Sequence, residues 1–266
     1  MYAAAALSLS LSASARAATE VDLELVLAVD VSLSMDLEEQ RLQRDGYVAA
    51  FRDPEILKAI GAGPQARIAV AYVEWAGPAI QSTVVPWTLI DGPMAAEAFA
   101  ARLERLQISR GRMTSIAAAL DYSGRLFDNS LYRGVRRVID ISGDGPNNSG
   151  RTVESARDDL VAKGIVINGL PVVLKNGAGT GANFFDIEDL DEYYADCVIG
   201  GTGAFMIPVR DKAEFTPAIR RKLLMEISGI MLQPRLIPAQ STSRDKADCL
   251  IGEKLWERYM QGRFRE

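Results

Sequence analysis

The chain has 266 residues, of which 48% are hydrophobic and 24% charged, a composition typical of a globular protein with a full hydrophobic core. The 30 Lys and Arg residues against 35 Asp and Glu residues give a formal charge of −5, which excludes an electrostatic surface for nucleic acid or anionic lipid. Histidine is absent, which excludes Ser-His-Asp catalysis, histidine bases and histidine-ligated zinc or iron. With two cysteines, a four-cysteine metal site within one chain is excluded too, so a metal would need oxygen ligands.

The first 18 residues, MYAAAALSLSLSASARAA, are small and apolar and end in an A-x-A triplet. They predict an export signal peptide at residues 1–18, although no basic segment begins it, and a flexible Ala/Ser tail is the alternative. The sequence has no apolar run long enough for a membrane span. Export would place the protein in the periplasm or outside the cell. There Cys197 and Cys249 can form a disulfide, with two separate buried thiols as the alternative.

From residue 23 onward, short apolar runs alternate with longer amphipathic ones, which predicts an α/β fold with a mostly parallel sheet. Strands are predicted at residues 23–30, 67–75, 81–88, 137–142, 164–173 and 204–209. Helices are predicted at residues 36–60, 94–106, 115–127, 152–162, 190–197 and 216–228. The link between the second and third strands is too short for a parallel crossover, so these two should pair antiparallel, and Pro86 puts the third at a sheet edge. Residues 231–266 are polar and irregular and predict a C-terminal extension.

Polar residues follow two of the predicted strands. The first strand leads into a D-x-S-x-S pattern formed by Asp30, Ser32 and Ser34, and the fourth strand leads into Asp144 within Ser-Gly-Asp-Gly. Thr114 adds a hydroxyl just before a predicted helix. Carboxylate and hydroxyl oxygens are hard ligands that suit Mg²⁺, which also keeps a position open for an external ligand. Turn and helix-capping roles are the alternative for the same residue types.

Taken in this order, the D-x-S-x-S loop, the hairpin, the loop threonine and the Gly-Asp-Gly turn resemble the von Willebrand factor type A domain with its metal-ion-dependent adhesion site. The segments DVSLSM, YVEWAG and DISGDGPNN look most like a bacterial branch of exported proteins of unknown function. The resemblance implies one domain at residues 21–230, with a doubly wound six-stranded sheet in the order 3-2-1-4-5-6, one antiparallel edge strand and helices on both faces. It implies that the metal ligands are Asp30, Ser32, Ser34, Thr114 and Asp144.

This fold gives the two aspartates a physical reason to share a cation. The first and fourth strands would be neighbours, and their carboxyl ends would flank the crevice where the winding of the sheet reverses. Asp30 and Asp144 would then lie close together and repel each other without a cation between them.

The resemblance implies a binding protein that is not an enzyme. Its cation, Mg²⁺ with Mn²⁺ or Ca²⁺ as alternatives, would bind an Asp or Glu of a protein partner. The main alternative is a metal-dependent hydrolase of the phosphoesterase kind, with Asp140, Glu74 or Lys175 as the base. A scaffold with a degenerate metal site is the third hypothesis.

Two further signals favour structural interpretations. Residues 145–152 differ by one position from a phosphate-binding loop, but Arg151 replaces its lysine and Pro146 removes an N–H, so nucleotide binding is not expected. Asp140 lies in the middle of a predicted strand, where a buried charge needs a partner. We expect it to bond an arginine or the backbone, with a functional role as the alternative.

Overall fold

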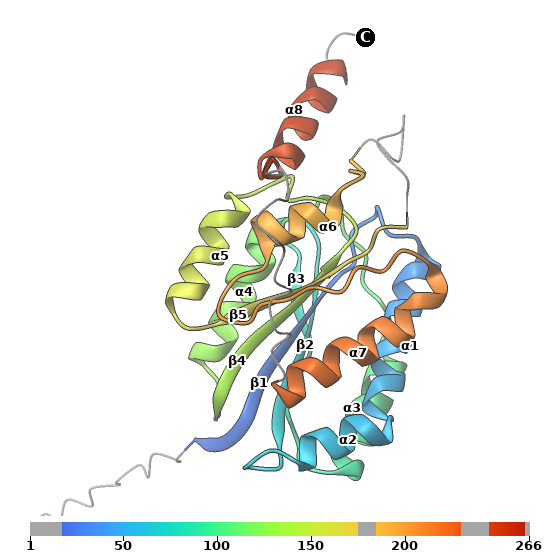
Figure 1. Ribbon diagram of the computed structural model, residues 1–266. Coiled ribbons are helices and arrows are strands. Elements are labelled where there is room, and N and C mark those ends of the chain that lie inside the picture. The colour runs from blue at the N-terminus through green and yellow to red at the C-terminus, as the bar shows by residue number, and fades with distance from the viewer. Residues whose placement is uncertain (1–17, 175–184, 230–244, 264–266) are drawn as a thin grey trace, which may run out of the picture.

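A five-stranded sheet forms the centre of the computed structural model, which describes residues 18–174, 185–229 and 245–263 (Figure 1). Its strands are β1 (Thr19–Asp30), β2 (Ile68–Trp75), β3 (Gln81–Ile90), β4 (Tyr132–Gly143) and β5 (Val166–Pro171). They lie in the order β3-β2-β1-β4-β5, and all neighbours are parallel except β2 and β3. The α/β class and the antiparallel edge strand are therefore confirmed. The predicted signal peptide, apart from Ala18, lies outside the described residues.

The predicted sixth strand, at residues 204–209, does not join the sheet as a continuous ladder. The segment makes only isolated bridges with the end of β5, between Gly169 and Met206 and between Val172 and Val209. Pro171 stands between these two bridges and has no N–H to donate to the neighbouring segment. Within the described residues the sheet thus has five strands, and the prediction of six is wrong.

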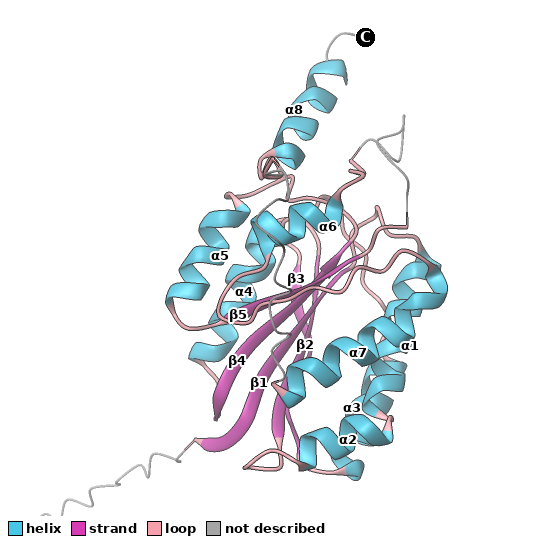
Figure 2. Ribbon diagram, viewed as in Figure 1, coloured by secondary structure: helices cyan, strands magenta, loops and turns pink. Residues whose placement is uncertain are grey.

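Helices cover both faces of the sheet (Figure 2). One face carries α1 (Leu37–Phe51), α2 (Pro54–Gly61), α3 (Pro93–Arg105) and α7 (Phe215–Ser228). The other carries α4 (Ile116–Asp128), α5 (Val153–Ala162) and α6 (Leu190–Tyr193), which continues into a π-helical turn at Tyr194–Val198. A final helix, α8 (Ile251–Arg263), follows in the C-terminal segment.

The helix predicted at residues 36–60 is in fact two helices. Asp36 caps α1, and Asp53 caps α2 by accepting a hydrogen bond from Glu55 N at 2.7 Å. Pro54 is the first residue of α2, where its missing N–H costs nothing, whereas inside one long helix it would break the hydrogen-bond ladder. The sequence signal for this break was present, and the prediction overlooked it.

The core lies in two layers because the central strands bury both of their faces. Leu25 and Leu27 of β1 pack toward α1 and α7, where they belong to the same apolar cluster as Phe51. Val26 and Ala28 alternate with them and face the cluster beneath α4 and α5. This alternation fixes the register of β1, because a shift by one residue would exchange the two layers.

A buried group of three charges joins α7 to the sheet. Lys222 Nζ lies 2.6 Å from Asp140 Oδ1 and also pairs with Glu226, and all three side chains are buried. Asn168 Nδ2 donates to Glu226 Oε1 at 3.0 Å. The partner of Asp140 is thus a lysine, and not the arginine or backbone group that we expected. Two carboxylates face one ammonium, so burial and then the charge of Asp140 raise the pKa of Glu226 to about 7.

A disulfide between Cys197 and Cys249 attaches the C-terminal segment to the domain. Ala247 N also donates to Asp196 Oδ2 at 2.8 Å beside it. The predicted disulfide is therefore confirmed, and residues 245–263 of the predicted extension are held against the domain. Residues 230–244 lie outside the described residues.

Among the helices of the described residues, none combines the length and the apolar character that a membrane crossing requires.

The disulfide should contribute to global stability. It closes a chain segment with a sequence separation of 52, for which the chain-entropy account gives about 4 kcal/mol. We expect Cys249→Ser to lower the free energy of unfolding in denaturant titrations by up to this amount, and Cys197→Ala/Cys249→Ser to lower it no further. Two alkylated thiols in the native protein, seen by intact mass without reductant, would contradict the bond.

The buried group of three charges should make stability depend on pH. The pKa of Glu226 rises from 4.5 to about 7 on folding, so its stabilising contribution is complete below about pH 4.5 and is lost as the pH rises through 7. We expect Glu226→Gln to flatten the fall in unfolding free energy between these pH values. Glu257→Gln, at an exposed position of α8, is the matched control. Equal pH slopes in the wild type and Glu226→Gln would show that this proton is not taken up on folding.

Candidate metal centre

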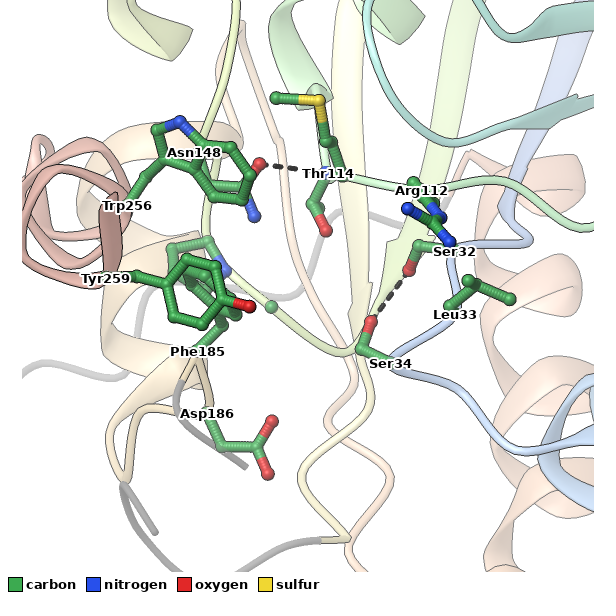
Figure 3. Close-up of a pocket in the computed structure, with 13 residues that line it drawn as sticks. Ser32, Leu33, Ser34, Arg112, Thr114, Asn148, Phe185, Asp186, Trp256 and Tyr259 are labelled. Atoms are coloured by element: carbon green, nitrogen blue, oxygen red, sulfur yellow. Dashed lines mark hydrogen bonds between the residues drawn. The ribbon is translucent and has the colours of Figure 1, made fainter. Parts of the chain in front are cut away.

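The loop that follows β1 places three of the predicted ligands in one hydrogen-bonded chain. Asp30 is buried at the end of β1, and its Oδ1 accepts a hydrogen bond from Ser32 N at 2.7 Å. The hydroxyls of Ser32 and Ser34 lie 2.7 Å apart (Figure 3). Ser34 Oγ then donates to Asp144 Oδ1, also at 2.7 Å. The first loop is thus linked directly to the second.

Asp144 reaches this chain because β4 lies beside β1. The two strands are parallel and pair as far as Val29 with Ser142, so their carboxyl ends open at the same edge of the sheet. Loops at this edge, where the strand order reverses, form the crevice in which α/β proteins bind ligands. Sequence reasoning predicted this convergence, and the structure places the two loops together.

Thr114 comes from a third loop, at the beginning of α4. Its N–H donates to Asn148 Oδ1 at 2.9 Å, and Asn148 N donates to Thr114 O at 2.8 Å. This pair of hydrogen bonds fixes the threonine loop to the loop after β4. Thr114 lines the same cleft as Ser32 and Ser34, and Figure 3 shows its hydroxyl turned into that cleft. Asn148 is therefore a positioning residue that the sequence analysis did not identify.

The donor set fits a divalent cation. Asp30 Oδ2 is buried and accepts no hydrogen bond from any described residue. A Cβ atom at Gly143 would lie 2.9 Å from this oxygen. The absence of a side chain at this position therefore leaves room for the Asp30 carboxylate. Burial, and next the charge of Asp144, raise the pKa of the Asp30 carboxyl well above its usual value. A cation beside Oδ2 would relieve both effects, and carboxylate and hydroxyl oxygens are the ligands that Mg²⁺ prefers.

The candidate centre is not a cluster of acids. In the part of the chain that the structure describes, no group of three or more Asp, Glu, Cys or His side chains could hold a metal. The five predicted residues bring two carboxylates and three hydroxyls, so most of the candidate ligands are uncharged.

The residues that the hydrolase hypothesis needs as bases have other roles in the structure. Glu74 forms a buried ion pair with Arg44 and accepts a hydrogen bond from Ser109 N at 3.0 Å. Asp140 pairs with Lys222 in the core. Lys175 lies outside the described residues.

A cleft of about 700 Å³ opens beside the candidate centre. Ser32, Ser34 and Arg112 line one side of it, and Phe185 with Trp256 and Tyr259 of α8 line the other (Figure 3). These aromatic residues were not among the predicted site residues. The available signal was the amphipathic pattern around Trp256 and Tyr259, which indicates a packed helix but does not show what it packs against.

Comparison with known proteins gives a family match and a fold. The family described as "Protein of unknown function (DUF1194)" matches residues 20–231. A search of curated protein sequences found no match.

Three solved structures illustrate the likeness in fold. Proximal thread matrix protein 1 from the mussel byssus, with a zinc-occupied MIDAS motif, has a TM-score of 0.55 at 12% identity, covering 79% of this chain and 49% of that one. A von Willebrand factor type A protein from Catenulispora acidiphila has a TM-score of 0.53 at 15% identity, covering 78% and 43%. The pilus adhesin SpaC from Lactobacillus rhamnosus GG has a TM-score of 0.55 at 11% identity, covering 79% and 31%. The chain thus spans half or less of these proteins, and the likeness shows a fold of the von Willebrand factor type A class.

Proposed function

The chain belongs to the DUF1194 family of proteins of unknown function, and we propose that it is a metal-dependent protein-binding module. The proposed cation ligands are the five residues that the three loops bring to the sheet edge: Asp30, Ser32, Ser34, Thr114 and Asp144. The observation that carries the proposal is the buried Asp30 Oδ2, which no described residue hydrogen-bonds and which lies beside Gly143 at the end of β4.

The chemistry of the donor set favours an acidic partner. When bound, the cation would supply a Lewis-acidic position for a carboxylate oxygen of an Asp or Glu on the partner protein. Three of the proposed ligands are the neutral hydroxyl oxygens of Ser32, Ser34 and Thr114. They would coordinate the cation without reducing its positive charge, whereas further carboxylates would reduce it. Mg²⁺ is the cation proposed, and Mn²⁺ and Ca²⁺ have the same preference for oxygen.

Binding, rather than catalysis, is the use of the site that we propose. Two of the acids considered as bases are held in buried ion pairs, Glu74 with Arg44 and Asp140 with Lys222. The fold supports binding by analogy, since a mussel protein of this fold holds zinc in its MIDAS motif and another protein of this fold is a pilus adhesin.

Export is part of the same proposal. The disulfide between Cys197 and Cys249 supports an oxidising compartment, because such bonds are rare where thiols are kept reduced. We propose the periplasm or the cell exterior as the location.

Metal binding should stabilise the folded chain, because the ligands converge only on folding. At roughly 100 times its dissociation constant, Mg²⁺ should add about 2.7 kcal/mol to the free energy of unfolding and raise the melting temperature. We expect Asp30→Ala and Asp30→Asn to abolish this rise, the second while keeping an acceptor for Ser32 N. Asp45→Ala, at an exposed position of α1, should keep it. An equal rise in the Asp30 variants would place the cation elsewhere.

The absence of catalysis is tested separately. A panel of phosphatase and esterase substrates with Mg²⁺ or Mn²⁺ should give no turnover above the level measured with chelator. Turnover that disappears in Asp30→Ala would identify the protein as a hydrolase instead.

A further inference from the structure

The C-terminal helix α8 is packed directly on one of the loops that carry the candidate centre. A Cβ at Gly252 would lie 2.0 Å from Asn147 O, so the helix and the loop backbone are in close contact. Asn147 Nδ2 also donates to Glu253 Oε1 at 2.6 Å. Asn147 is three residues after Asp144 in the same loop. Together with the disulfide at Cys249, these contacts fix the position of α8 relative to the cation ligands.

This placement brings an aromatic cluster to the wall of the cleft. The cluster consists of Phe185, Trp256 and Tyr259, with ring centroids 5.5 to 5.8 Å apart. Trp256 and Tyr259 are only partly buried, so their rings still offer surface to a ligand. Figure 3 shows the cluster on one side of the cleft and Ser32 and Ser34 on the other.

The opposite rim combines an apolar side chain with a positive charge. Leu33, between the two ligand serines, is 47% exposed, although large apolar side chains are usually buried. Arg112 is exposed beside it and forms no ion pair with any carboxylate of the described residues. The cleft thus offers the positive charge of Arg112 beside the serine loop and apolar surface on both sides, and the carboxylate of Asp186 also lines it.

We propose that this cleft binds an extended segment of a partner protein in which an aromatic residue lies close in sequence to the metal-binding Asp or Glu. The proposal rests on the proposed function, since it takes the acid to be bound at the cation. The aromatic cluster receives the partner's ring by edge or offset stacking, and Arg112 attracts the acid. A cleft of about 700 Å³ is far larger than one carboxylate needs and falls within the usual range for sites that enclose a whole ligand. The family match ends at residue 231, so the extension supplies two of the three rings of the cluster, Trp256 and Tyr259, and the matched region supplies Phe185.

The test uses the full chain with Mg²⁺ and capped pentapeptides, with binding measured by calorimetry. The reference peptide has Asp at its centre and Gly elsewhere. Four others each carry one Phe at one of the flanking positions, so that every spacing is sampled. We expect at least one Phe peptide to bind about tenfold more tightly than the reference, because ring stacking adds to apolar burial. If no Phe peptide binds more than twofold more tightly, or if no peptide binds at all, the proposal is wrong.

Variants of α8 assign the preference to the aromatic cluster. Trp256→Ala/Tyr259→Ala should reduce the tenfold preference to twofold or less, while the affinity for the reference peptide and the Mg²⁺-induced rise in melting temperature stay unchanged. Trp256→Phe/Tyr259→Phe keeps both rings and should keep the preference, and Glu257→Ala on the same helix is the matched control. A preference that survives the double alanine variant would overturn the role of the cluster.

The outcomes separate this proposal from the proposed function. If the Asp peptides bind only with Mg²⁺ but Phe makes no difference, the aromatic wall is wrong and the metal-dependent function stands. If binding is the same with chelator, or if Asn replaces Asp without loss, the metal-dependent function itself is wrong. Mg²⁺-dependent dimers of the chain that peptides do not dissociate would identify a second copy as the occupant and overturn the proposal of an extended segment.

Discussion

The structure around the candidate centre depends on one electrostatic constraint, the convergence of Asp30 and Asp144 at the end of two adjacent parallel strands. A carboxylate at the carboxyl end of β1 and another after β4 are brought together because these strands pair along most of their length. Asp30 is fully buried there, and the charge of Asp144 adds to the cost of ionising it. Around this pair of charges lie the hydroxyls of Ser32 and Ser34, the loop that carries Thr114, and Gly143.

The same molecule shows how it stabilises buried carboxylates elsewhere. Glu74 forms an ion pair with the guanidinium of Arg44. Asp140 and Glu226 both pair with the ammonium of Lys222. Asp30 Oδ1 accepts a hydrogen bond from Ser32 N, and no cationic side chain of the described residues pairs with Oδ2. Each of these core carboxylates thus lies against a cationic side chain, which Asp30 Oδ2 does not. Since a buried charge without a partner is costly, this contrast is the physical basis for proposing a cation at the edge and for treating the other acids as structural.

The C-terminal extension gives this common fold a feature of its own. The disulfide at Cys197 and the close contact between Gly252 and Asn147 hold α8 over the loop after β4. As a result the candidate centre is not a flat surface but one side of a cleft with an aromatic wall. Two of the three rings proposed to set partner specificity therefore come from outside the matched family region, while the proposed metal ligands come from inside it.

The sequence by itself determined the α/β class and the antiparallel edge strand, because apolar periodicity and loop length record local geometry and burial. The five candidate ligands came from loop motifs together with the family resemblance, and they stay a prediction. The disulfide was also predictable, since a chain with two cysteines allows only one intramolecular pairing. Tertiary structure decided the rest. The edge segment at residues 204–209 carries strand-like periodicity, but its pairing depends on the proline it meets in β5. The lysine beside Asp140 lies 82 positions away on α7, and the ring of Phe185 meets Trp256 only because a distant bond folds the extension back. Contacts of this kind join residues far apart in the chain, and no local pattern specifies them.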